Sequence, residues 1–100
     1  MFSIDQEAID IINKMTNNPF GINGSLWLYW LFSLDLIPGG WTARFYLEDN
    51  YGKLKPERSY IGFGLPSKAI KEAYNSIDQK WLEEGFEQGR LLSKAYEEKK

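Results

Sequence analysis

Apolar and mixed positions alternate on both sides of Pro38-Gly39, and this pattern constrains the fold more than any other feature of the chain. From Leu26 to Leu36 every even-numbered residue is apolar, whereas the odd-numbered positions include Ser33 and Asp35. A period of two puts both polar residues on one face of a strand, whereas a helix would scatter them. Proline followed by glycine is the preferred centre of a type II turn. The pattern therefore predicts an antiparallel hairpin.

The stretch after this turn alternates as well and predicts the partner strand. One face would carry Trp41, Ala43, Phe45 and Leu47, and the other Thr42, Arg44, Tyr46 and Glu48. Arg58 to Phe63 predicts a third strand, which Gly62 and Gly64 weaken, so we expect it at an edge of the sheet. The alternative for Leu26–Ile37 is a helix, but that helix would be apolar on all sides and would need complete burial.

Helical periodicity is found before and after the predicted sheet. Residues 4–17 place apolar side chains on one face, and Ser3 with Gln6 has the spacing of a capping box. From Pro66 to Lys100, apolar residues again recur with a helical period, opposite lysine and glutamate. This segment is either one long helix or a pair with a break near Asn75, since Ser76 and Gln79 repeat the capping-box spacing.

These patterns predict an α+β fold with an N-terminal helix, a three-stranded antiparallel β-meander, and a long C-terminal helix or helix pair. One domain over residues 1–100 suits the length, and 43% hydrophobic residues are enough for one core. The longest apolar stretch is too short to cross a bilayer, and the N-terminus lacks the basic and apolar regions of a signal peptide. We therefore expect a cytoplasmic protein with no membrane contact.

The chain contains no histidine and no cysteine, which removes the usual agents of acid–base, nucleophilic and transition-metal chemistry. Carboxylates remain at Asp35, Glu48-Asp49 and Glu83-Glu84, but turns and solvated helix faces explain them without catalysis. No phosphate-binding loop, dinucleotide fingerprint or metal-ligand spacing occurs. We therefore expect no enzymatic activity, no cofactor and no metal.

Aromatic residues are abundant, at 16% of the chain, and provide the candidate site. If the uniformly apolar strand faces pack on the helices, the opposite faces gather rings and guanidinium groups on one side of the sheet. Tryptophan, tyrosine and arginine are enriched at protein-interface hot spots. The predicted partner-binding residues are Trp27, Tyr29, Arg44, Tyr46, Arg58 and Tyr60.

Two alternatives compete with a protein-binding surface at this place. The first helix could cover the second face, although Arg44 and Arg58 argue against full coverage, because unpaired arginine is rarely buried. The same rings could instead stack on a nucleotide or on single-stranded nucleic acid. The net charge of −2 favours a protein partner and does not suit a duplex-DNA binder.

The sequence therefore favours a non-enzymatic interaction protein that occupies a partner's surface through this face and the Asp49–Glu57 loop. Stoichiometric inhibitors, immunity proteins and phage-encoded antagonists have this small, acidic character, which is an association by size and charge alone. Gly85 and Gly89, four residues apart on the last predicted helix, offer a flat strip. That strip serves either a tight crossing within the chain or a homo-oligomer contact.

Overall fold

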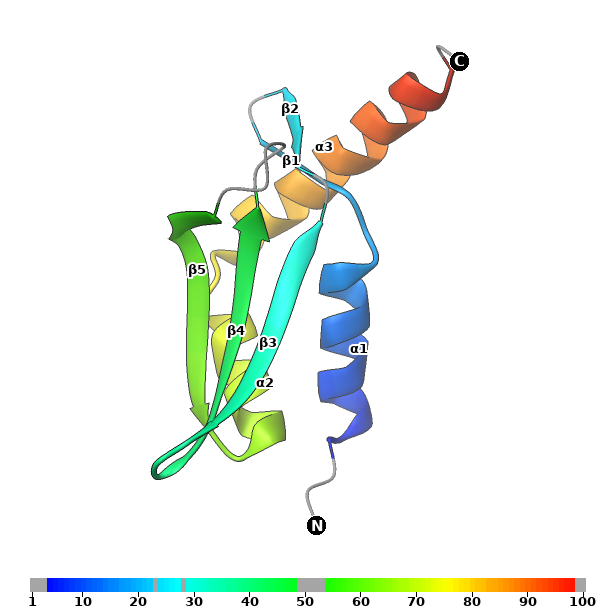
Figure 1. The fold of residues 1–100 in the computed structure, drawn as a ribbon. Helices are drawn as coiled ribbons and strands as arrows, with labels where there is room; N and C mark the ends of the chain where they lie inside the picture. Colours follow the sequence, from blue (N-terminus) through cyan, green and yellow to red (C-terminus); the bar gives the residue numbers. More distant parts are fainter. Residues whose placement is uncertain (1–3, 23, 28, 49–53, 99–100) are drawn as a thin grey trace.

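The computed structural model describes residues 4–22, 24–27, 29–48 and 54–98, without the side chains of residues 25–27, 48, 54–58 and 98. The predicted α+β fold is confirmed, with one helix before the sheet and two after it (Figure 1). In chain order the elements are α1 (Gln6–Thr16), β1 (Phe20–Ile22), β2 (Ser25–Trp27), β3 (Trp30–Ile37), β4 (Gly40–Glu48), β5 (Leu54–Gly64), α2 (Pro66–Asn75) and α3 (Gln79–Glu98).

The main sheet is an antiparallel meander in the order β3-β4-β5, which places β4 in the middle. Ile37 pairs with Gly40 across a loop formed by Pro38 and Gly39. Gly39 has a φ of 95°, the left-handed conformation that the third residue of a type II turn requires. The predicted hairpin is therefore confirmed, and so is the edge position of the third strand.

The segment predicted as one strand, Leu26–Ile37, is divided between two sheets. Its first residues belong to β2, which pairs antiparallel with β1 in a separate two-stranded sheet. Only the part from Trp30 onward enters the main sheet. The alternation rule gave the correct faces but not this break, because the residues around it are as apolar as the strand itself.

Side-chain hydrogen bonds cap the starts of α1 and α3, and the sequence patterns predicted the helices but not these capping residues. The Oδ1 atom of Asp5, the N-cap of α1, accepts a hydrogen bond from the Ala8 N–H at 2.9 Å. The predicted cap, Ser3, lies outside the described residues. The break near Asn75 is real, and Asp78 caps α3 by accepting hydrogen bonds from the backbone N–H groups of Lys80 and Trp81.

The helices α1 and α2 lie in one layer, packed against each other beside and behind the sheet (Figure 1). Lys71 of α2 bonds to the Asp5 carboxylate at 2.8 Å, which ties the start of α1 to α2. The helix α2 crosses β5 closely, because a Cβ on Gly62 would overlap the backbone of Ala69 and Ala73. Gly62 is thus required for the packing of α2 on the sheet.

The core contains a cluster of aromatic rings with Trp30 at its centre. Its ring centroid lies 5.4 Å from that of Phe20, 5.8 Å from Tyr60 and 6.0 Å from Trp81. Phe86 adds an edge contact to Phe20 at 5.2 Å. We call these five rings the aromatic cluster. Edge-to-face pairs of this kind stabilise a core beyond the area that they bury.

The glycine strip on α3 is filled by the chain itself. A Cβ on Gly85 would overlap the ring of Phe20, and a Cβ on Gly89 would overlap the backbone at Pro19. Both glycines are buried. The strip therefore seats β1 against α3, which is the first of the two interpretations, a tight crossing within the chain.

Among the described residues, no helix combines the length and the apolar character that a membrane crossing requires.

Candidate interaction surface

None of the described helices covers the face of the main sheet that points away from α2 (Figure 1). Trp30, Phe45 and Tyr60 mark the covered face, because their rings join the core. Residues one position away in each strand point to the other side. We call that side the open face, and its members are Leu31, Ser33, Asp35, Thr42, Arg44, Tyr46, Ser59, Ile61 and Phe63.

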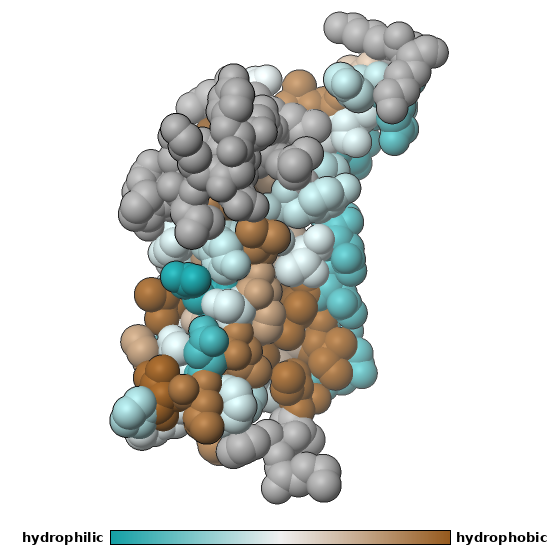
Figure 2. All heavy atoms as spheres, in the orientation of Figure 1, coloured by the Kyte–Doolittle hydropathy of each residue, from teal (hydrophilic) through white to brown (hydrophobic). Residues whose placement is uncertain are grey.

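Two apolar side chains stand exposed on β5 in this face. Ile61 is 46% exposed and Phe63 is 54% exposed, although neither is near a chain end. Leu36 and Leu65 are also exposed near the end of the sheet beside the β3–β4 turn, but Leu36 is in phase with Trp30 and points to the side of the covered face. Figure 2 shows apolar atoms over the sheet and gathered at that end. A clustered patch of this kind is typical of an interaction site, whereas scattered exposed residues are not.

The centre of the open face is a cation–π pair on β4. The guanidinium carbon of Arg44 lies 4.7 Å from the centroid of the Tyr46 ring. Both side chains are half-buried, and Arg44 is paired in register with Ser33 on one side and Ile61 on the other. No carboxylate of the described part of the chain forms an ion pair with Arg44. The guanidinium group thus retains donors that a bound partner could use.

The structure brings together only two of the six predicted binding residues, Arg44 and Tyr46. Tyr60 was expected beside them but lies on the covered face, with its ring 6.4 Å from that of Trp81. Tyr29 is exposed but precedes β3 and is not part of the sheet. Trp27 belongs to β2, away from the open face, and its side chain lies outside the described part. The side chain of Arg58 lies outside it too.

Sequence reasoning missed Ile61 and Phe63 because it assigned the faces of the third strand the wrong way round. The alternation itself was correct, but both faces carry apolar residues, so hydrophobicity did not choose between them. A signal was available in Gly62, since a glycine inside a strand often marks a close backbone approach. The face with Gly62 is the one that meets α2, which leaves Ile61 and Phe63 outside.

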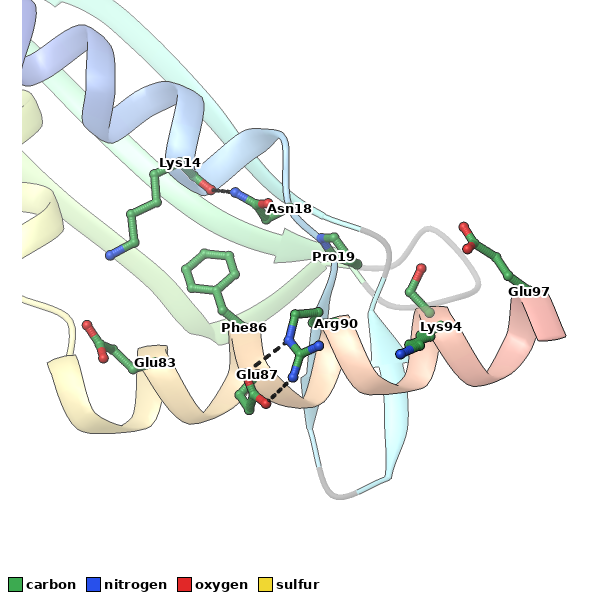
Figure 3. Close-up of a pocket in the computed structure, with 10 residues that line it drawn as sticks. Lys14, Asn18, Pro19, Glu83, Phe86, Glu87, Arg90, Lys94 and Glu97 are labelled. Atoms are coloured by element: carbon green, nitrogen blue, oxygen red, sulfur yellow. Dashed lines mark hydrogen bonds and ion pairs between the residues drawn. The ribbon is translucent and has the colours of Figure 1, made fainter.

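A second concave site lies between the end of α1 and α3 (Figure 3). It has a volume of about 580 Å³, and Phe86 lies between Lys14 on one side and Arg90 on the other. The charged residues that line it are balanced: Lys14, Arg90 and Lys94 against Glu83, Glu87 and Glu97. Arg90 already donates hydrogen bonds to both carboxylate oxygens of Glu87. The groove therefore has no net attraction for an anionic ligand.

The resolved pKa shifts lie in exposed ion pairs away from the open face. The Lys71 ammonium and the Ala8 N–H hold the pKa of Asp5 below its usual value, and Asp5 in turn raises the pKa of Lys71. Arg90 likewise lowers the pKa of Glu87. These pairs connect helices or successive helix turns, which is a structural role. Within the described ranges, no group of three or more acidic side chains is placed to hold a metal ion.

No protein-family model matches the chain, and comparisons with curated proteins and with solved structures also give no match.

Proposed function

We propose that this protein is a non-enzymatic interaction module that binds another protein on the open face. The observation that carries the proposal is the exposure of Ile61 and Phe63 beside the Arg44–Tyr46 pair on an uncovered sheet. Apolar anchors next to an arginine and a tyrosine have the composition of an interface centre. Occupying the partner's surface is the mechanism, since the described side chains of this face form no acid–base or nucleophilic constellation.

The chemistry of the open face describes the partner surface that it would fit. Ile61 and Phe63 suit an apolar side chain or ridge, because they are two positions apart on β5 and lie side by side on the same face. Arg44 suits a carboxylate, since it lacks an ion-pair partner among the described residues. The partner surface would therefore combine an apolar centre with an acidic residue a few ångströms away.

A nucleotide or single-stranded nucleic acid is the second candidate, and the geometry favours it less. Stacking platforms need rings with free faces beside several cations. On the open face, the Tyr46 ring is already covered by Arg44, and Tyr60 is turned into the core. One arginine gives little counterion release, so the electrostatic contribution to binding would be small.

The test compares three variants in their capture of partners from nuclease-treated host lysate. Arg44→Glu and Phe63→Ser change the open face, whereas Arg90→Ala changes the groove between α1 and α3. We expect a protein that the wild type and Arg90→Ala both retain and that the two open-face variants lose. With that protein purified, each open-face substitution should weaken binding by about tenfold or more, the size of a hot-spot loss.

Salt and stability measurements separate the alternatives. An apolar contact with one ion pair should weaken modestly with salt, whereas nucleic-acid binding falls steeply. Thermal unfolding must show that Arg44→Glu and Phe63→Ser remain folded. Loss of the partner on Arg90→Ala alone would move the site to the groove, and loss on nuclease treatment would favour nucleic acid over protein.

A further inference from the structure

The outer edge of β5 carries backbone groups without a strand neighbour. In the order β3-β4-β5, and among the residues that the structure describes, the strand β5 is hydrogen-bonded on one side only. Because Ile37 and Gly40 flank a two-residue loop, they form a hydrogen-bonded pair, and such pairs then alternate along the ladder. The odd-numbered residues of β4 therefore bond to β5, where their partners are Tyr60, Gly62 and Gly64.

This alternation fixes which amides of β5 point outward. The Thr42 hydroxyl donates to the Gly62 carbonyl at 3.3 Å, which independently shows that this carbonyl faces β4. Neighbouring residues of a strand direct their N–H and C=O groups to opposite sides. The backbone groups of Ser59, Ile61 and Phe63 thus face the outer edge. Exposed rows of this kind are templates for pairing with another strand.

Only half of this edge has the features that natural sheets use against pairing. Residues 55–58 read Lys-Pro-Glu-Arg, and charges with a proline are typical protections of an edge strand. From Ser59 to Gly64 there is no charge and no proline, and the side chains next to the outward amides include the exposed Ile61 and Phe63. The unprotected half is long enough for a short ladder and too short for a fibre-like edge.

The helix α2, which packs on β5, carries a lysine and a glutamate that could pair with the same two residues of a second copy. Lys68 and Glu72 are exposed, and neither forms an ion pair within the described part of the chain. They lie on one side of α2, opposite the buried Ile70. The Lys68 side chain lies beside the last residue of β5, since a Cβ on Gly64 would stand 3.2 Å from Lys68 Cδ. Lysine four residues before glutamate is the weaker order for a pair within one helix.

We propose that a second copy of this chain pairs with the outer edge of β5, antiparallel and about a two-fold axis. The two sheets then form one continuous sheet of six strands. Ile61 and Phe63 of the two copies meet across the seam on the open face. On the other face the two α2 helices run antiparallel, so Lys68 of each copy approaches Glu72 of its partner. A two-fold contact forms each interaction twice and closes the assembly at two chains.

The dimer is a separate proposal from the partner-binding function, and either one can be wrong while the other is right. The ion pairs of the dimer lie on the helix side of the sheet, whereas Arg44 lies on the open face. Charge changes on α2 therefore test the dimer without altering a residue of the partner site. Substitutions at Arg44 do the reverse.

The experiment is sedimentation equilibrium of the full chain over a wide range of concentrations. We expect a reversible change from one chain to two. Lys68→Glu and Glu72→Lys should each weaken the dimer by about tenfold, because each places like charges together at two symmetric positions. The double variant Lys68→Glu/Glu72→Lys restores opposite charges and should return the dissociation constant to near the wild-type value.

A backbone variant tests the ladder itself. Ile61→Pro removes an outward N–H that the monomer does not use, and proline is tolerated on the open side of an edge strand. It should abolish the dimer while circular dichroism shows a folded chain. If this variant does not fold, hydrogen exchange of the wild-type chain is measured instead. The Ile61 and Phe63 amides should then become protected as the protein concentration rises.

The matched control is Lys80→Glu/Glu84→Lys, an exposed pair with the same spacing on α3, which should leave the dimer unchanged. A wild-type chain that stays monomeric throughout overturns the proposal, even if another protein later proves to bind this edge. The proposal is also overturned if neither single charge reversal changes the dissociation constant of the dimer, or if the double variant does not return it to near the wild-type value.

Discussion

The aromatic cluster packs against one face of the main sheet through Trp30 and Tyr60, and the open face is the other side of that sheet, yet the two regions use aromatic residues in different ways. In the cluster, five rings contact one another in edge-to-face or tilted pairs at centroid distances between 5.1 and 6.4 Å. On the open face, the Tyr46 ring is covered by a guanidinium group, and Phe63 stands exposed beside Ile61. The comparison teaches that an excess of rings in a sequence does not by itself indicate a binding surface.

The composition explains why the rings went to the core. The chain has no valine and only two threonines, so it lacks the small β-branched residues that commonly fill a sheet. A core between a three-stranded sheet and short helices must still be filled to normal packing density. Trp30, Phe20 and Phe45 supply that volume, each fully buried.

Truncation of Trp30, at the centre of the aromatic cluster, should have the largest effect on the stability of the fold. Trp30→Ala removes a fully buried ring that contacts three others, and should cost about 3–5 kcal/mol of unfolding free energy. Within the described residues, its Nε1 atom has no hydrogen-bond partner, so Trp30→Phe should lose much less. Urea unfolding at one temperature measures both. Equal losses for the two variants would show that ring packing is not what Trp30 contributes.

Two tyrosines on adjoining strands allow a direct comparison of the covered face with the open face. Tyr60 packs on Trp30 and Trp81, whereas Tyr46 lies on the other side of the same sheet. Tyr60→Ala should cost about 2 kcal/mol more than Tyr46→Ala, because only the first leaves a cavity in the core. The two substitutions are chemically identical, so the difference in urea midpoint reports the face alone. A larger loss for Tyr46 would mean that the open face is structural.

The elements that followed from the sequence are those with a strong local signal. The type II turn at Pro38-Gly39, the alternation of β4 and the periodicity of the helices were all predicted. Each depends on neighbouring residues and a stereochemical rule. The same logic placed Arg44 and Tyr46 on the correct face of the sheet, because β4 has one uniformly apolar face and one mixed face.

What could not be predicted depends on contacts between distant segments. Nothing local distinguishes β2 from β3, since their separation arises from the pairing of Phe20 with Trp27. The faces of β5 were reversed because Tyr60 and Phe63 are equally able to fill a core. Contact with α2 decides between them, and that contact is made by residues that follow the strand. The glycine strip on α3 was open to two interpretations until Phe20 was placed against it.

The smallest expected effect is a pH dependence from the pair that joins α1 to α2, outside both compared regions. Hydrogen bonds from Lys71 and from the Ala8 N–H lower the pKa of Asp5 in the folded protein. A carboxyl whose pKa is lower in the folded state than in the unfolded state stabilises the fold above its unfolded pKa. That contribution is lost as the pH falls through the folded pKa. The loss should therefore appear below the usual aspartate range of about pH 4.

Two variants separate the charge of Asp5 from its capping role, with thermal midpoints measured at neutral and at acid pH. Asp5→Asn keeps an oxygen that can cap α1 but has no charge to lose, so its midpoint should fall less on acidification than that of the wild type. Lys71→Met removes the first cause of the shift and keeps the second, so its acid loss should be intermediate. Because the pair is half-exposed, both differences should be small beside those at Trp30 and Tyr60. Parallel decreases in all three proteins would assign the acid sensitivity to other carboxylates.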